Sequence, residues 1–184
     1  MRATASACAA TVGKSCHPPL GTSILAPASE PEVALQLRTR SADETRALGH
    51  RLGGAVRAGD VILLRGPLGG GKTVLVQGMA AGLGATVDVI SPTFVLVRHY
   101  RGRLELVHAD LYRLESRREI DELGLEELAA AGVLVVEWSD RAPWLEESPG
   151  VIVLELEAAA GGAANDRSVA VQRAPQHLLA ALSG

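Results

Sequence analysis

The chain has 184 residues, of which 47% are hydrophobic, and its formal net charge is −3. This length predicts one domain with a sizeable core, and the apolar content excludes a wholly disordered chain. The slight negative charge excludes a global basic field that would attract nucleic acid, and no apolar run approaches the roughly 18 residues that span a bilayer.

The N-terminal segment, residues 1–31, differs in composition from the rest. It is rich in Ala, Ser, Thr and Pro and has no hydrophobic periodicity, so we predict a disordered tail here, or a start site placed too early. Cys8 and Cys16 both lie in this tail, and with His17 they are too few for a zinc site, which needs about four ligands. Residues 32–184 are predicted to form the folded domain, and a cysteine-free core suits a cytoplasmic protein.

The first predicted elements follow directly after this tail. Alternating apolar residues over 33–37 predict a half-buried strand. Ser41 and Glu44 have the spacing of a capping box, and the helix that they begin is predicted to end at the turn Gly59-Asp60. The continuous apolar run 61–64 then predicts a strand that is buried on both faces.

Strand and helix patterns continue to alternate toward the C-terminus. Further strands are predicted at 93–97, 104–109, 133–136, 151–156 and 168–171, and further helices at 72–83, at 116–128 with a break at Gly124, and at 176–182. The last two strands are predicted to be an antiparallel pair at the edge of the sheet. Strands interleaved with helices in this way predict a three-layer α/β fold.

The segment from Gly66 to Thr73 fits the phosphate-loop pattern G-x-x-x-x-G-K-S/T. Its glycines let the backbone turn tightly and direct N–H groups at phosphate oxygens, and the next helix adds its positive N-terminal end. Lys72 is predicted to reach the β and γ phosphates, and the Thr73 hydroxyl to bind Mg²⁺. A glycine-rich turn with a chance Lys-Thr is the alternative, but the buried strand before it and the helix after it favour a P-loop NTPase-like domain. Its sheet is then central and mostly parallel, with antiparallel edge strands.

A phosphate-loop enzyme needs a further acidic group near its metal, at the end of a buried strand. Glu137 follows the apolar run 133–136, and Asp110 follows the strand 104–109. Each is a candidate to hold Mg²⁺ or its waters, and each has the alternative of being a surface carboxylate at a strand end. The two patterns leave the division of roles between these acids open.

Three neighbouring features have weaker signals. The turn Ser91-Pro92-Thr93 offers hydroxyls that either sense the γ phosphate or only stabilise the turn. Trp138, directly after Glu137, is predicted to pack in the core or at an interface. His108 shares a strand face with Asp110. It is either a satisfied neighbour of the site or a group that supports the site's ligands from behind, and the pattern favours the first.

These motifs occur together in a set that resembles one known family. The phosphate loop is followed by S-P-T-F at 91–94, H-A-D-L-Y-R-L at 108–114 and V-E-W at 136–138. This order and spacing resemble the TsaE (YjeE) family over residues from about 33 to 173. Many families share the loop alone, whereas the other three motifs are specific.

The resemblance implies a P-loop ATPase whose weak hydrolysis of ATP is enhanced by partner subunits. It implies ATP as the nucleotide and Mg²⁺ as the metal. The implied partners are the threonylcarbamoyl-transferase subunit and the inactive paralogue of that subunit. The implied role is the threonylcarbamoyladenosine modification of tRNA at adenosine 37, with tRNA contacted only through the complex and no membrane partner.

The resemblance also implies a role for each matching residue. Catalytic roles fall to Lys72, Asp110 and Glu137, and metal contacts to Thr73, Asp110 and Glu137. The implied nucleotide contacts are Ser41, Thr45, Gly66, Leu68, Gly69, Gly70, Gly71, Lys72, Thr73, Val74, Thr93, Trp138 and Arg167. Within this set, the start of the helix at Ser41 to Thr45 lies near the adenine in the family, and Trp138 lies beside the site.

Three features depart from the family pattern. The family usually has an acid after the first loop glycine, where this chain has Pro67, which has no N–H to donate. It usually has Ala-Gly before the lysine, where this chain has Gly70-Gly71. The tail before Glu32 is also absent from the family.

Three rival functions fit a phosphate loop as well. A small P-loop kinase would need an acceptor site and an arginine-rich lid, and the sequence has no such lid pattern. A GTP switch would need a guanine-reading N-K-x-D segment, which does not occur. An ATP-dependent docking module without a catalytic role would use the nucleotide only to order a binding surface.

Overall fold

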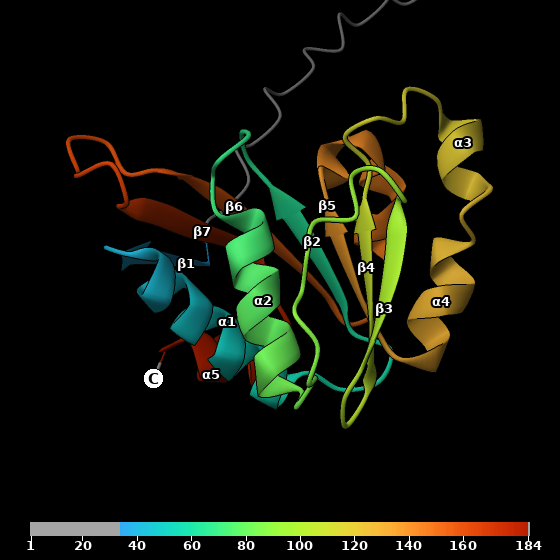
Figure 1. Ribbon diagram of the computed structural model, residues 1–184, viewed down its shortest axis with the longest axis horizontal. Helices are drawn as coiled ribbons and strands as arrows, with labels where there is room; N and C mark the ends of the chain where they lie inside the picture. Colours follow the sequence, from blue (N-terminus) through green and yellow to red (C-terminus); the bar gives the residue numbers. More distant parts are fainter. Residues whose placement is uncertain (1–33, 184) are drawn as a thin grey trace, which may run out of the picture. The chain divides into compact units, whose positions relative to one another are not determined.

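The computed structural model describes residues 34–183 (Figure 1). The tail predicted for residues 1–31, with both cysteines, lies outside this range. The strands in chain order are β1 (Leu35–Thr39), β2 (Val61–Arg65), β3 (Val97–Arg101), β4 (Glu105–Asp110), β5 (Val133–Glu137), β6 (Val151–Ala158) and β7 (Arg167–Arg173). The helices are α1 (Ala42–Ala55), α2 (Lys72–Gly82), α3 (Arg117–Asp121), α4 (Leu125–Ala131) and α5 (Gln176–Ser183), with short 3₁₀ turns η1 (Ser139–Arg141) and η2 (Pro143–Glu147).

The strands of the described part form one seven-stranded sheet in the order β1-β7-β6-β2-β5-β4-β3. The central strands β6, β2, β5 and β4 are parallel to one another. The edge strands β1 and β3 pair antiparallel with β7 and β4. The predicted mostly parallel sheet with antiparallel edges is therefore confirmed.

The last two predicted strands are antiparallel to each other, as expected, but their predicted place at the edge of the sheet is wrong. The strand predicted at 168–171 is β7, which lies between β1 and β6. The strand predicted at 151–156 lies one position further in. As β6 it lies inside the sheet, between β7 and β2. Its residues 151–154 are all buried, which is the pattern of a strand that is covered on both faces.

Helices cover both faces of the sheet, as a three-layer fold requires (Figure 1). On one face the core joins α1, α2 and α5 to the sheet through residues such as Leu52, Leu75 and Leu178. On the other face α3 and α4 pack on the sheet through Ile120 and Leu125. Alternate residues of the central strands enter the two cores in turn, which is why those strands are continuously apolar.

Two local predictions need correction. Ser41 caps α1, because its side chain accepts from the Glu44 N–H, but the Glu44 carboxylate accepts from the Arg40 N–H instead of closing a box on Ser41. Residues 93–96 form a turn rather than a strand. The Pro92 carbonyl there accepts from the N–H groups of Val95 and Leu96, so the strand begins only at Val97.

The contact between α1 and α2 tests this packing. A Cβ added at Gly53 would lie 2.1 Å from the Met79 carbonyl oxygen, whereas at Gly54 it would meet nothing within 4 Å. We expect Gly53→Ala to lower the free energy of unfolding by about 1–3 kcal/mol, since two backbones must separate. The adjacent control Gly54→Ala should raise it by up to about 1 kcal/mol, because alanine favours a helix. Denaturant unfolding of both variants measures the difference, and equal effects would contradict this packing.

Candidate nucleotide site

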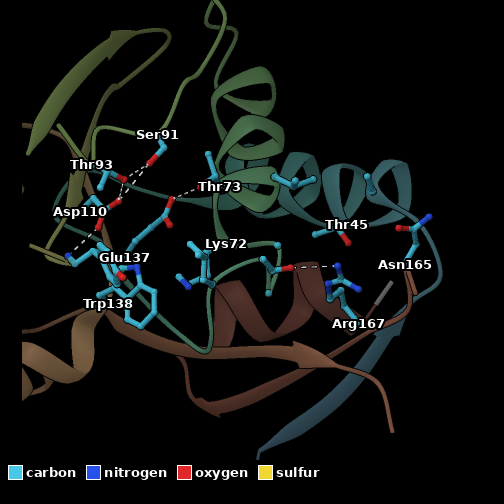
Figure 2. Close-up of a pocket in the computed structure, with 17 residues that line it drawn as sticks. Thr45, Lys72, Thr73, Ser91, Thr93, Asp110, Glu137, Trp138, Asn165 and Arg167 are labelled. Atoms are coloured by element: carbon cyan, nitrogen blue, oxygen red, sulfur yellow. Dashed lines mark hydrogen bonds between the residues drawn. The ribbon is translucent and has the colours of Figure 1, made fainter. Parts of the chain in front are cut away.

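The carboxyl ends of β2, β4 and β5 meet at a cavity of about 360 Å³ (Figure 2). Most of the sequence-predicted site residues line it, namely Thr45, Leu68, Gly69, Gly70, Gly71, Lys72, Thr73, Val74, Thr93, Asp110, Glu137, Trp138 and Arg167. Ala42, Ser91, Tyr112 and Asn165 line it as well and were not in the predicted set. In open α/β sheets, ligands bind in such a crevice beyond the ends of the strands.

Two residues of the predicted set do not line the cavity. The Ser41 side chain is engaged in capping α1, and the next residue, Ala42, faces the cavity instead. Gly66 lies behind the loop, where a Cβ would come within 2.0 Å of the Leu156 carbonyl oxygen. With a φ of 117°, this position requires glycine for its conformation and for the close approach of β6.

The loop joins the end of β2 to the start of α2, as the motif predicts. Gly71 precedes the helix in the left-handed conformation, and no side chain caps the helix there. The first N–H groups of α2, from Lys72 to Val74, therefore lie at the cavity without a capping side chain. Such a helix end attracts anions, and phosphate is the anion that this loop pattern predicts.

Lys72 crosses the mouth of the loop, and its residue is only 4% exposed. Its Nζ donates to the carbonyl oxygens of Gly66 and Pro67 at 2.8 and 2.9 Å and lies 4.1 Å from the centre of the Trp138 ring. Burial lowers the pKa of Lys72 from its ordinary value, while the carboxylates of Glu137 and Asp110 partly offset that effect. The ammonium thus lies in a buried site beside carboxylates.

Glu137 connects β5 to the phosphate loop. Its Oε1 accepts the Thr73 hydroxyl at 2.8 Å. Strand register explains the contact, because β5 pairs with β2 and places Glu137 beside Leu64, just before the loop. The glutamate that follows the apolar strand is therefore the acid next to the loop threonine.

Asp110 connects β4 to the turn at 91–93. Its Oδ2 accepts hydrogen bonds from the hydroxyls of Thr93 and, at 3.3 Å, Ser91, and its Oδ1 accepts the Tyr112 N–H at 2.9 Å. Asp110 and Glu137 are paired residues of neighbouring parallel strands, so the two carboxylates lie side by side at the cavity (Figure 2). They differ in their contacts, because one holds the loop and the other holds the turn.

Trp138 packs at the cavity edge in the left-handed conformation, with a φ of 60°. Its ring lies 4.9 Å from that of Tyr112, and the Lys72 ammonium lies over it. A bulky residue at positive φ costs free energy and is frequent at functional sites. The tryptophan that was predicted to pack in the core or at an interface thus contacts the phosphate-loop lysine.

Arg167, at the start of β7, and Asn165, in the loop before it, also line the cavity. Arg167 donates to the Gly69 carbonyl at 3.1 Å, and its side chain lies against Gly71 together with that of Thr45. Asn165 follows a stretch of alanine and glycine without periodicity, at 158–164, so no sequence signal identifies it. Tyr112 lies within the H-A-D-L-Y-R-L motif at 108–114, so it could have been included in the predicted site on that ground.

The donor set fits a magnesium ion with a nucleotide. Thr73, Asp110 and Glu137 supply one hydroxyl and two carboxylates, and Mg²⁺ takes one or two carboxylates together with waters and substrate phosphates. Within residues 34–183, no group of three or more His, Cys, Asp or Glu side chains could hold a metal ion by itself. The arrangement therefore fits a metal that arrives with phosphate ligands.

No helix in residues 34–183 is long and apolar enough to cross a membrane.

Comparison with known proteins identifies the family. The model of the family described as "Threonylcarbamoyl adenosine biosynthesis protein TsaE" matches residues 39–168. Two relatives named "tRNA threonylcarbamoyladenosine biosynthesis protein TsaE" are similar. The Nostoc sp. protein is 46% identical over 55% of this chain and 66% of its own length, and the Treponema pallidum protein is 42% identical over 56% and 77%. The chain thus spans just under two thirds of the Nostoc relative.

A solved structure agrees with these matches. The crystal structure of Bacillus subtilis YdiB superposes with a TM-score of 0.62 at 30% identity, covering 81% of this chain and 93% of that protein. The expected P-loop NTPase-like fold is thereby confirmed. Because the family model matches more than half of the chain, in the region that holds the loop and both acids, the chain belongs to the TsaE family.

Proposed function

We propose that the protein binds ATP with Mg²⁺ in this cavity and hydrolyses it slowly, as the ATPase subunit of the threonylcarbamoyladenosine modification of tRNA at adenosine 37. Residues 32–184 form the ATPase domain in this proposal. Its partners are the threonylcarbamoyl-transferase subunit and the inactive paralogue of that subunit, in the cytoplasm. Contact with tRNA is indirect, through the complex.

The observation that carries the proposal is the convergence of the loop with two carboxylates at one cavity. The uncapped N-terminus of α2 and the buried Lys72 supply the positive groups that a triphosphate needs. Asp110 and Glu137 line the same cavity and offer the oxygen ligands that Mg²⁺ prefers. The names of the relatives support the proposed pathway.

The contacts support a division of roles between the two acids. Glu137 accepts the Thr73 hydroxyl, so this pair would hold the metal ion beside the loop. Asp110 accepts hydrogen bonds from Thr93 and Ser91, so it would link the metal ion to the turn at 91–93. When bound, Mg²⁺ would neutralise charge on the β and γ phosphates.

Slow turnover is expected because the lining arginine is already engaged with backbone carbonyls. Arg167 is the one arginine among the described lining residues, and its guanidinium donates to the carbonyls of Gly69, Ala164 and Asp166. An arginine that stabilises the transition state is worth about 10³- to 10⁵-fold in rate. A partner subunit that supplies such a cation to the cavity would therefore raise the rate of hydrolysis.

The test is ATP hydrolysis by the protein alone, and then with both proposed partner subunits and tRNA. We expect a low rate alone and a clear increase in the complex. Phosphate transferred to an added small acceptor instead of water would favour a kinase. ATP-dependent partner binding without any turnover would favour the docking module, and no ATP binding at all would refute the proposal.

A further inference from the structure

A fully buried histidine lies behind the cavity on β4. His108 is 0% exposed, and its Nε2 lies 2.9 Å from Oε1 of Glu137. The same oxygen accepts the Thr73 hydroxyl at 2.8 Å. This single carboxylate oxygen therefore joins His108 to the phosphate loop.

Strand register builds this contact. In the pairing of β4 with β5, His108 lies opposite Val135, and Asp110 lies opposite Glu137. His108 and Glu137 are thus diagonal neighbours on one face of the sheet, a distance that long side chains can bridge. Both strands lie inside the sheet and both side chains are buried, so neighbouring strands and side chains hold this geometry.

The direction of the hydrogen bond follows from the chemistry of the two groups. An ionised carboxylate only accepts, so the Nε2 of His108 carries the hydrogen that Glu137 receives. The Nδ1 of His108 is buried and has no hydrogen-bond partner in the described part of the chain. A second hydrogen there would be a buried donor without an acceptor, which is unfavourable. The polar contact of this side chain is therefore directed only at the site.

We propose that His108 is a positioning residue for Glu137. Its Nε2–H fixes one carboxylate oxygen against Thr73, so that Glu137 lines the cavity in one orientation. The inference rests on the proposed function, since it takes Glu137 to act on Mg²⁺ or its waters. Residues that orient a metal ligand in this way typically change metal affinity or activity 10- to 100-fold when they are replaced.

Two substitutions of His108 by amide side chains of different length distinguish a positioning role from a packing role. In His108→Gln the side-chain amide nitrogen lies near the original Nε2 and can still donate to Glu137. In His108→Asn it lies near the original Nδ1 and is too short to reach. His99→Asn on β3 is a matched control, because it removes a half-exposed histidine whose Nδ1 lies 3.2 Å from Glu105, outside the cavity.

The measurement is calorimetric binding of a non-hydrolysable ATP analogue, in MgCl₂ and in EDTA. We expect His108→Asn to weaken binding in MgCl₂ about 10- to 100-fold, with no change in EDTA. His108→Gln and His99→Asn should match the wild type in both. Wild-type binding by His108→Asn in MgCl₂ would overturn the proposal, as would equal losses in the Gln and Asn variants.

Nitrogen-15 NMR of the wild type supplies an independent readout if His108→Asn does not fold. Hydrogen on the Nε2 of His108 is the expected result, and a neutral ring with hydrogen on Nδ1 alone would overturn the proposal. A wild type that binds the analogue equally well in MgCl₂ and EDTA would refute the metal-dependent function itself. That outcome is distinct from the failure of His108→Asn alone, which refutes only the role of His108.

Discussion

Lys72→Ala is expected to abolish measurable ATP binding and to reduce hydrolysis by at least about 10²- to 10³-fold, the typical cost of removing one preorganised charge-stabilising donor. Lys72 is the one lysine among the described residues, and its ammonium already lies between the loop carbonyls and Trp138. No other lysine of residues 34–183 can therefore replace its charge. Calorimetric titration with ATP and MgCl₂, together with a phosphate-release assay, measures both effects.

The control for this prediction is the thermal stability of a second variant at this position, Lys72→Met. Because burial lowers the pKa of Lys72 in the folded state, the unfolded chain binds more protons between the folded and unfolded pKa values. Burial of the charged lysine therefore costs stability in the nucleotide-free fold below the folded pKa, and this cost falls as the pH rises from the folded toward the unfolded pKa. Lys72→Met should accordingly unfold at the same or a higher temperature than the wild type. Undiminished ATP binding by this well-folded variant would contradict the site.

Glu137→Gln is expected to lower kcat by at least about 10²-fold, the lower limit for a positioned acid–base group. The amide keeps the shape of the side chain and can still accept the Thr73 hydroxyl at its oxygen, but it removes the negative charge next to the metal. Nucleotide affinity in EDTA should be retained, since the phosphate loop is intact. Single-turnover hydrolysis with saturating ATP and MgCl₂ separates the chemical step from binding.

Glu155→Gln is the matched control for this prediction. Glu155 lies on β6 and contacts Gln172, outside the lining of the cavity, so its rate should equal that of the wild type. An equal kcat for Glu137→Gln and the wild type would remove Glu137 from the mechanism. Asp110 would then be the remaining carboxylate to test.

The phosphate loop and the two acids could be predicted because each follows a strong local pattern. The loop has fixed spacing between a buried strand and a helix, and Glu137 directly follows a strand whose residues are all buried. Parallel strands end at one edge of the sheet, so an acid that follows such a strand is brought to the loop by topology alone. The fold class could be predicted for the same reason, from strands that alternate with helices.

Features set by tertiary contacts were not predictable from local patterns. Thr93 has the sequence of a strand start, but its hydroxyl bonds Asp110 and the Pro92 carbonyl closes a turn. The edge assignment of residues 151–156 and 168–171 failed because strand order depends on which strands pair. β6 pairs with β2, and β7 pairs with β1. Asn165 reaches the cavity from an irregular loop, and such loops have no periodicity from which to predict a position.

The division of labour between Asp110 and Glu137 also required the structure. Both acids follow buried strands, so the sequence pattern treats them alike. Only the pairing of β5 with β2, rather than of β4 with β2, places Glu137 against Thr73. The contact of His108 with the same oxygen depends on the register of β4 against β5, so the sequence could not show which acid His108 contacts.

The most direct test of the central claim is an amide NMR titration of the wild type with a non-hydrolysable ATP analogue and MgCl₂. If the phosphates bind the loop and the start of α2, the largest chemical-shift changes fall on the backbone N–H groups of residues 69–74. Smaller changes are expected at Thr93 and Trp138. Shifts confined to another part of the described chain, or their absence at millimolar analogue, would contradict a nucleotide site in this loop.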